Sequence, residues 1–297
     1  MADASDALSS RKERIEAVLP GLLAPGVCPM PESLRVAVEY SLTAGGKRMR
    51  PVVLLSAGAV AGGDEEAMMP FACAIEYVHT YSLIHDDLPA MDDDDFRRGR
   101  PTCHKAFDEP TAILAGDALL TEAFRAMAES ALAREAPGRS MRAIAVLARA
   151  AGASGMVGGQ QLDVAAERKP SGSADVLSIH EGKTAALFSA AAAMGAILGG
   201  GDDTVVGRMS RYGKALGLLF QVTDDILDET GSFEEMGKAV AKDRGRGKAT
   251  WPVVYGLEAS MARASALGDE ALAMLDGFGP DADPLREIVR KVSVRRG

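Results

Sequence analysis

Residues 220–228 read FQVTDDILD and set three aspartates into an apolar segment with helical spacing. An α-helix turns about 100° per residue, so Asp224 and Asp228 lie one turn apart on one face, with Asp225 nearby and Gln221 on the same side. Carboxylates crowded on one face repel one another unless a cation lies between them. The apolar neighbours argue against a solvated turn, so the segment predicts a buried helix that carries a cation site.

Helical spacing of apolar residues recurs along the whole chain, and no run of the strict alternation typical of a strand stands out. Proline and glycine mark the ends of segments, as at Pro31, at Gly45–Gly46 and at Pro51. We expect helices over residues 31–45, 51–60, 68–88, 111–134, 139–165, 175–200, 203–230 and 248–265, with loops over 92–108, 168–173 and 231–247. Since no shift in composition divides the chain, one all-α domain over residues 1–297 is predicted.

The composition narrows the class of protein further. Hydrophobic residues make up 47% of the chain and aromatic residues only 5%. The apolar content is dominated by Ala, Leu, Val and Met, and small side chains of this kind favour closely packed helices over a sheet. The formal net charge of −9 argues against a nucleic-acid partner, because phosphate backbones require a basic face. Small phosphorylated substrates remain compatible, since bound metal ions reverse the local charge.

Cysteines and apolar stretches bear on the cellular location. Cys28, Cys73 and Cys103 have unrelated spacings and form neither a disulfide framework nor a tetrahedral metal pattern, which favours a reducing cytoplasm. The segment 1–19 is polar and lacks the apolar region of a signal peptide. The most apolar stretch, residues 185–200, is too short to span a membrane and predicts a buried helix.

Another acidic cluster, the first aspartate motif in chain order, reads HDDLPAMDDDDFRRGR over residues 85–100. Its aspartates are more widely spaced than those of the second motif, FQVTDDILD. Asp86, Asp87 and Asp92 follow the pattern DDxxxxD, and Pro89 should loosen the helix after Leu88 so that Asp92 returns toward the same cation. The next three aspartates are typical of a solvated turn. Neither cluster has the alternating ligands and central glycine of a calcium loop, so we expect Mg²⁺ shared with substrate phosphate.

Cationic residues recur beside these acidic clusters. The segment GGKRMRP places Lys47, Arg48 and Arg50 at the start of the helix that Pro51 opens, and a helix N-terminus with cationic side chains is an anion site. Further cations follow the acidic motifs or open an Ala-rich helix: Arg97, Arg98, Lys183, Lys238 and Lys248. Each alone is typical of a solvated surface, but their recurrence indicates binding of phosphate groups.

Taken together, these motifs resemble the trans-isoprenyl diphosphate synthases, in particular the bacterial farnesyl diphosphate synthases. The resemblance rests on segments that occur in the family's order and extend over most of the chain: GGKRMRP (45–51), HTYSLIHDDLPAMDDDDFRRGRPTCH (79–104), ILAGDALL (113–120), GGQQLD (158–163), HEGKTAALF (180–188), FQVTDDILD (220–228) and GKAVAKDRGRGKATWP (237–252). The resemblance implies an isoprenoid synthase-type bundle of about ten or more helices around a central cavity, usually as a homodimer.

The resemblance also implies roles for the matched residues. The two aspartate motifs would hold the metal, expected to be three Mg²⁺ ions, through Asp86, Asp87 and Asp92 of one motif and Asp224, Asp225 and Asp228 of the other. Arg97, Lys183 and Lys238 would grip the allylic diphosphate. Isopentenyl diphosphate would bind to Lys47, Arg50, His79 and Arg98. The developing carbocation would lie near Thr184 and Gln221, which with Lys183 are the expected catalytic residues. The expected reaction condenses isopentenyl diphosphate with dimethylallyl and geranyl diphosphate, without an activated side-chain nucleophile.

Residues before the first motif form the floor of the product pocket in this family. Tyr81 lies five positions before Asp86 and Ser82 lies four positions before it. This arrangement resembles farnesyl-type enzymes, so (2E,6E)-farnesyl diphosphate is the expected product. Geranyl and geranylgeranyl diphosphate are the alternatives, because other helices also shape the floor.

Three other functions are compatible with parts of the pattern. A terpene cyclase would share the first aspartate motif, but its second motif normally mixes Asn or Asp with Ser or Thr and Glu, which DDILD does not. A non-catalytic regulatory subunit tends to lose one aspartate motif, whereas both are intact here. A cation-buffering helical protein would bind metal without any dependence on diphosphate. Product formation from dimethylallyl and isopentenyl diphosphate separates these alternatives.

Overall fold

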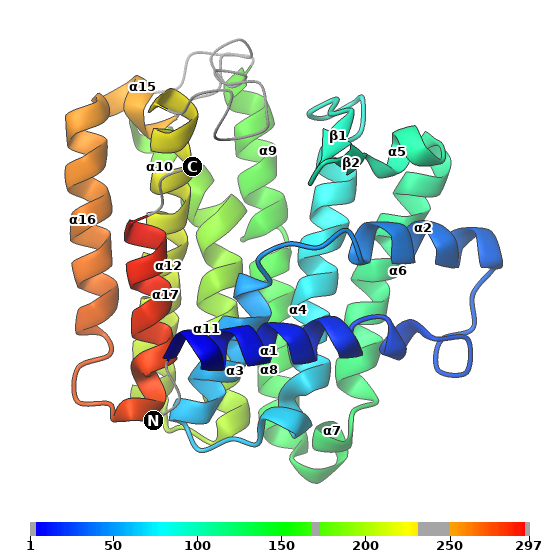
Figure 1. The fold of residues 1–297 in the computed structure, drawn as a ribbon, viewed down its shortest axis with the longest axis horizontal. Helices are drawn as coiled ribbons and strands as arrows, with labels where there is room; N and C mark the ends of the chain where they lie inside the picture. The colour runs from blue at the N-terminus through cyan, green and yellow to red at the C-terminus, as the bar shows by residue number, and fades with distance from the viewer. Residues whose placement is uncertain (1–3, 168–172, 231–249, 295–297) are drawn as a thin grey trace.

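The computed structural model describes residues 4–167, 173–230 and 250–294, and nearly all of them lie in helices (Figure 1). The first part of the chain forms α1 (Ala4–Val18), η1 (Gly21–Leu23), α2 (Glu32–Leu42), α3 (Met49–Val60), α4 (Glu65–Asp86), α5 (Cys103–Ala106), α6 (Glu109–Ala128), α7 (Ala131–Glu135) and α8 (Pro137–Ala151). The second part forms α9 (Met156–Glu167), α10 (Ser173–His180), η2 (Glu181–Ala185), α11 (Ala186–Gly199), α12 (Asp203–Thr230), α15 (Trp251–Tyr255), α16 (Leu257–Ala273), η3 (Pro280–Ala282) and α17 (Asp283–Ser293). The predicted all-α fold is confirmed.

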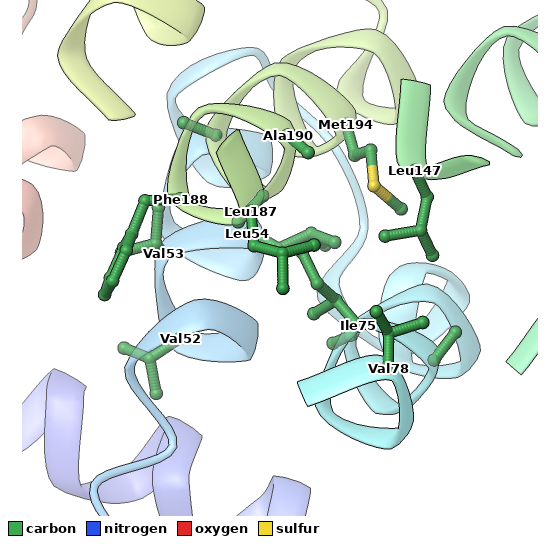
Figure 2. Packing of buried hydrophobic residues seen from close by; sticks show 14 of the residues in the cluster. Val52, Val53, Leu54, Ile75, Val78, Leu147, Leu187, Phe188, Ala190 and Met194 are labelled. Carbon is green, nitrogen blue, oxygen red and sulfur yellow. The ribbon is translucent and has the colours of Figure 1, made fainter. Parts of the chain in front are cut away.

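Helix α11 lies at the centre of the packing, against α3, α8 and α12. Figure 2 shows Leu187 and Met194 of α11 among Leu54 of α3, Ile75 of α4 and Leu147 of α8. Small residues line α11, and Gly195 permits the closest approach: a Cβ there would lie 2.1 Å from the carbonyl oxygen of Leu54. The Ala- and Gly-rich composition therefore sets how closely the central helices pack.

The apolar run that includes α11 is buried, as the sequence predicts. Residues 176–199 are long and apolar enough to cross a membrane by length and composition alone. However, 72% of the most apolar window lies inside the fold, which is the pattern of a core helix.

The helix α4 ends at Asp86, and the chain then forms a small hairpin. Strand β1 (Phe96–Arg97) pairs antiparallel with β2 (Arg100–Pro101). Arg98 and Gly99 have φ of 53° and 74°, as a two-residue hairpin turn requires. The C-terminal ends of α4 and α12 both point toward the end of the molecule that carries this hairpin (Figure 1). The two aspartate motifs therefore lie at the same end of the bundle.

Several expected boundaries differ from the structure. The predicted helix 139–165 is two helices, because the chain is extended at Gly152 between α8 and α9. The predicted helix 111–134 is interrupted at Ser130, whose side chain accepts a hydrogen bond from the N–H of Ala133 and caps α7. The loop expected over 92–108 also contains the hairpin and α5. The loop expected over 231–247 lies outside the described residues.

The predicted helix 248–265 starts outside the described residues and divides at Gly256. Gly256 has φ of 85° and lies between α15 and α16. Helices α1 and α17 were not among those predicted. Apolar residues are few in α1, whereas Leu285, Ile288, Val289 and Val292 of α17 have the spacing of an amphipathic helix, a local signal that the prediction overlooked. The two helices pack on each other and on α3.

The approach of α11 to α3 gives a stability prediction. We expect Gly195→Ala to lower the free energy of unfolding by about 1–3 kcal/mol, because a Cβ there meets backbone that cannot rotate away. Chemical denaturation monitored by circular dichroism measures the change. Gly207→Ala on α12 is the matched control, since a Cβ there meets nothing within 4 Å and an alanine favours the helix. Equal stability of the two variants would refute this account of the packing.

Candidate functional site

A cavity of about 720 Å³ opens between α3, α4, α9, η2, α11 and α12. Its apolar lining includes Met49, Leu83, Met156, Val164, Phe188 and Phe220. It also brings together most of the predicted site residues: Lys47, Arg50, His79, Tyr81, Ser82, Asp86, Arg97, Arg98, Lys183, Thr184, Gln221 and Asp224. Asp87, Asp92, Asp225 and Asp228 lie outside its lining, and Lys238 lies outside the described residues. A mainly apolar pocket with a few converging charges suits a molecule that has a charged head and a hydrocarbon tail.

The chain after α4 curls back onto the end of the helix. The N–H of Asp92 donates to the carbonyl oxygen of Asp86 at 2.8 Å, and the N–H of Asp94 donates to that of Asp87 at 3.1 Å. This turn brings Asp92 beside Asp86, as the position of Pro89 predicts. Burial raises the pKa of Asp86 to about 6, with Lys183 opposing the rise and Asp92 adding to it. The ionised form of this carboxylate therefore gains from a nearby cation.

The second aspartate of the first motif holds an arginine. Asp87 is buried, and Nε of Arg97 donates to its two carboxylate oxygens at 2.8 and 2.9 Å, while Nη2 of Arg97 lies 2.6 Å from Oδ1. Because Arg97 also lines the cavity, Asp87 fixes the direction of a cation that faces the pocket. The adjacent aspartates thus face different partners.

The second motif divides in the same way. Asp224 lines the cavity, whereas Asp225 is buried and turns toward protein groups. Its Oδ1 accepts a hydrogen bond from Nε2 of Gln221 at 2.9 Å, and its Oδ2 accepts one from the backbone N–H of Trp251 at 2.8 Å. Asp228 lies one turn beyond Asp224 on α12. Asp225 thereby orients the amide of Gln221, whose Oε1 accepts a hydrogen bond from Thr184 at 2.8 Å.

Lys183 and Thr184 lie on a single π-helical turn, η2, between α10 and α11. Turns of this kind occur frequently at functional sites. Nζ of Lys183 donates to Oδ2 of Asp163 at 2.5 Å. Helix α9 approaches this turn closely because Gly159 and Gly182 face each other: a Cβ on Gly159 would lie 2.1 Å from the backbone nitrogen of Lys183. The glycines of the GGQQLD and HEGKTAALF motifs thus set the position of Lys183 and Thr184.

Cations gather on the side of the cavity formed by α3. The guanidinium of Arg50 lies over the ring of Phe188 at 4.5 Å, and Nζ of Lys47 lies 5.9 Å from the centre of the Phe220 ring. Burial lowers the pKa of Arg50 to about 10, so it stays charged at neutral pH. Among the described residues, Nε of Arg50 is a buried donor that makes no hydrogen bond. An anion in the cavity would satisfy this donor.

His79 lies among these cations and is neutral at pH 7. Burial lowers its pKa well below the usual value, and Arg50 and Arg98 lower it further. A neutral imidazole donates one hydrogen bond and accepts another, so His79 in this state can donate a hydrogen bond to an anionic group.

Three non-glycine residues in the described ranges have positive φ, namely Arg48, Asp93 and Arg98. All three lie in the two segments beside the cavity, and strained backbone of this kind concentrates at functional sites. Nη1 of Arg98 donates to the carbonyl oxygen of Gly45. A Cβ on Gly46 would lie 2.6 Å from the Arg98 guanidinium, so the glycine pair of GGKRMRP makes room for this arginine.

Tyr81 and Ser82 line the cavity on the α4 side. Tyr81 is 6% exposed, and its ring meets the ring of His85 edge to face, with centroids 5.7 Å apart. A ring nitrogen of His85 lies 3.0 Å from the carbonyl oxygen of Ile113 on α6, and Gly116 leaves the space that His85 fills. His85, which is held by α6, therefore packs against the ring of Tyr81 and limits its movement.

The acidic residues fit a shared metal site better than a closed cage. In the described ranges, His, Cys, Asp and Glu side chains form no group of three placed to hold a metal ion. Mg²⁺ commonly takes one or two protein carboxylates and completes its six ligands with water and substrate phosphate. Asp86 and Asp224, on different helices and both facing the cavity, suit that mode of binding.

Sequence reasoning left several residues of this site without a role. Asp163, which pairs with Lys183, and Gln160, whose buried Oε1 has no hydrogen-bond partner in the described residues, both line or adjoin the cavity. Their motif, GGQQLD, was the available signal. Glu76 also lines the cavity and is buried in α4, and no pattern in the sequence singles it out.

The comparisons with known proteins agree with this geometry. A model of the polyprenyl synthetase family matches residues 31–274. A curated relative, geranylgeranyl pyrophosphate synthase 9 of Arabidopsis thaliana chloroplasts, is 48% identical over 269 residues, which cover 89% of this chain and 75% of the relative.

Two solved structures share the fold closely. An FPP/GFPP synthase from Zymomonas mobilis has a TM-score of 0.85 and 38% identity, over 98% of this chain and 100% of the other. A geranyltransferase from Helicobacter pylori, complexed with magnesium and isoprenyl diphosphate, has a TM-score of 0.84 and 33% identity, over 98% and 97% of the two chains.

The contact between α9 and η2 gives a prediction about binding. We expect Gly159→Ala to weaken binding of pyrophosphate in the presence of Mg²⁺ by about 10- to 100-fold, because the added Cβ displaces Lys183. Isothermal titration calorimetry measures the affinity. Gly138→Ala on α8 is the control, since a Cβ there meets nothing within 4 Å. A folded Gly159→Ala protein with unchanged affinity would show that the glycine contact does not position the lysine.

Proposed function

We propose a pair of substrates and a product for this chain, which belongs to the polyprenyl synthetase family, the trans-isoprenyl diphosphate synthases. Members of this family are head-to-tail prenyltransferases, and so is this protein. The proposed reaction condenses isopentenyl diphosphate with dimethylallyl diphosphate and then with geranyl diphosphate. It releases diphosphate at each step and ends at (2E,6E)-farnesyl diphosphate. The observation that carries this proposal is one cavity whose lining joins aspartates of both motifs, a set of cations and a majority of apolar surface.

The allylic diphosphate binds, in this proposal, between the two aspartate motifs. Asp86 and Asp224 would hold Mg²⁺, with Asp92 beside Asp86, and Arg97 and Lys183 would contact the same diphosphate directly. Bound Mg²⁺ neutralises the charge that develops on the departing diphosphate. The family depends on magnesium, and we propose three ions in each site.

Loss of diphosphate leaves an allylic cation in the apolar part of the cavity. The hydroxyl oxygen of Thr184 and the amide of Gln221 are held in fixed directions by the hydrogen bonds that end at Asp225. Oriented dipoles stabilise developing charge without reorganisation at the moment of reaction. We assign this role to Thr184 and Gln221. Lys183, the third catalytic residue in this proposal, would neutralise charge on the departing diphosphate.

Isopentenyl diphosphate would occupy the second charged region, formed by Lys47, Arg50, His79 and Arg98. The free Nε–H of Arg50 and a neutral His79 supply hydrogen bonds to its phosphate oxygens. The double bond of this substrate attacks C1 of the allylic cation, and a proton then leaves the adjacent carbon. In this proposal the departing diphosphate would accept that proton. No side-chain base is then required, and His79 is assigned to binding of isopentenyl diphosphate.

Product length depends on the floor of the cavity. Tyr81 is an aromatic side chain buried at the wall and backed by His85, which supports a fifteen-carbon product. Geranylgeranyl diphosphate is the second candidate, because curated relatives that are 48% identical to this chain carry that product in their names. A homodimer in the cytoplasm remains the prediction for assembly and location.

The direct test of the activity is product analysis. Purified protein with Mg²⁺, dimethylallyl diphosphate and isopentenyl diphosphate should yield farnesyl diphosphate, identified by chromatography after phosphatase treatment. Chelation of Mg²⁺ should abolish turnover, and Asp224→Ala should lower kcat/KM by about 10³-fold or more. A cyclic hydrocarbon would indicate a terpene cyclase, and absence of any longer diphosphate would overturn the proposal.

The role of Tyr81 is tested by its substitution. We expect Tyr81→Ala to shift the products toward twenty carbons or more, because the cavity deepens where the ring lay. Mass spectrometry of the products measures the ratio. Tyr255→Ala, at a tyrosine that lies outside the lining of the cavity, is the control and should keep the parent product. An unchanged chain length in the Tyr81→Ala enzyme would place the floor elsewhere.

A further inference from the structure

A buried ion pair lies in the wall of the cavity, beside the residues of its cationic region. Arg48 is 4% exposed and Glu76 is 1% exposed, and Nη1 of Arg48 donates to Oε1 of Glu76 at 2.6 Å. Burying two charges costs free energy even when they are paired. A pair of this kind therefore calls for an explanation other than stability.

We propose that Arg48 and Glu76 form a positioning pair that sets the isopentenyl diphosphate subsite, by fixing Lys47, Arg50 and His79 relative to one another. This inference rests on the function proposed above. It assigns a role to two cavity-lining residues whose charged groups bind each other and act by holding their neighbours in place.

The guanidinium of Arg48 joins several segments of the chain. Nη1 of Arg48 contacts Glu76 on α4, and Nη2 donates to the carbonyl oxygen of Leu42, the last residue of α2, at 2.7 Å. Its Nε lies 3.4 Å from a carboxylate oxygen of Glu16 on α1. Arg48 thereby links α1, α2 and α4 at the point where α3 begins, a task that needs the planar fork of arginine.

The backbone conformation of Arg48 also supports the positioning role. Arg48 has φ of 49° and ψ of 34°, the left-handed conformation, and directly precedes the first residue of α3. This conformation is unfavourable for a residue with a Cβ, and it persists where surrounding contacts determine it. It turns the chain so that Lys47 and Arg50 line the cavity while the Arg48 side chain reaches Glu76 and Leu42.

The position of Glu76 on α4 links the ion pair to His79. Glu76 precedes His79 by three residues, so the two lie on neighbouring positions of one helical face. Fixing Glu76 to Arg48 therefore fixes the turn that carries His79 relative to the segment that carries Lys47 and Arg50. The negative charge of Glu76 also offsets the repulsion among the arginines of this region, since it favours the charged forms of Arg50 and Arg98.

The test compares the two substrates. Arg48→Lys keeps a positive charge paired with Glu76, so the protein should fold. A single ammonium group cannot bind Glu76 and the carbonyl oxygen of Leu42 together, so the link between the segments is lost. We expect its KM for isopentenyl diphosphate to rise about ten-fold, with KM for geranyl diphosphate within about two-fold of the parent. The double variant Arg48→Met/Glu76→Leu removes the pair without leaving a lone buried charge, and its KM for isopentenyl diphosphate should rise further.

One control completes the design. Arg11→Lys makes the same substitution at an arginine that forks Glu65 on the N-terminal turn of α4, away from the cavity, and should leave both KM values unchanged.

The outcomes separate this inference from the proposed function. If the parent protein forms no prenyl diphosphate, the proposed function fails. If the parent is active and the folded Arg48 variants keep the parent KM for isopentenyl diphosphate, or lose both substrates equally, the positioning role is wrong. Failure of both Arg48 variants to fold would make the pair a general structural element and would also overturn the inference.

Discussion

The arrangement of this protein depends on carboxylates held close together at one end of a helical bundle. Asp86 and Asp92 share the turn after α4, and Asp224 faces the same cavity from α12. Burial of Asp86 and its repulsion by Asp92 disfavour the ionised carboxylate, and nearby cations such as Lys183 offset that cost. No closed protein cage is present in the described ranges, so the arrangement favours metal ions shared with a phosphorylated ligand.

A second set of carboxylates lies behind the cavity and directs the groups that face it. Asp87 holds Arg97, Asp163 holds Lys183, and Asp225 holds Gln221. Glu76, which itself lines the cavity, likewise holds Arg48. In each DD pair one aspartate faces the cavity and the next binds a protein partner, and fixed partners keep catalytic groups in place as the substrate changes charge. Close helix contacts at Gly159 and Gly195 keep these pairs in register.

Much of the fold and the site could be predicted from the sequence, and the limits have physical causes. The helix 203–230 and the burial of 185–200 follow from apolar periodicity, which is a local signal. Apolar periodicity did not locate the breaks at Gly152 and Ser130, because backbone conformation and capping determine them. The sequence also did not predict that Asp87 and Asp225 bind protein groups. Adjacent aspartates differ only through their tertiary partners, which here are Arg97 and Trp251. Glu76 is similar: a buried glutamate within an apolar helix has no motif.

The central claim is that Mg²⁺ binds here mainly together with a diphosphate. It is tested by thermal unfolding with Mg²⁺ alone, with pyrophosphate alone and with both. Preferential binding to the folded state raises Tm, so a shared site predicts that the shift with both ligands exceeds the sum of the separate shifts. Asp224→Asn should remove that excess. A full shift with Mg²⁺ alone would contradict the account, because it would require a metal site complete without phosphate.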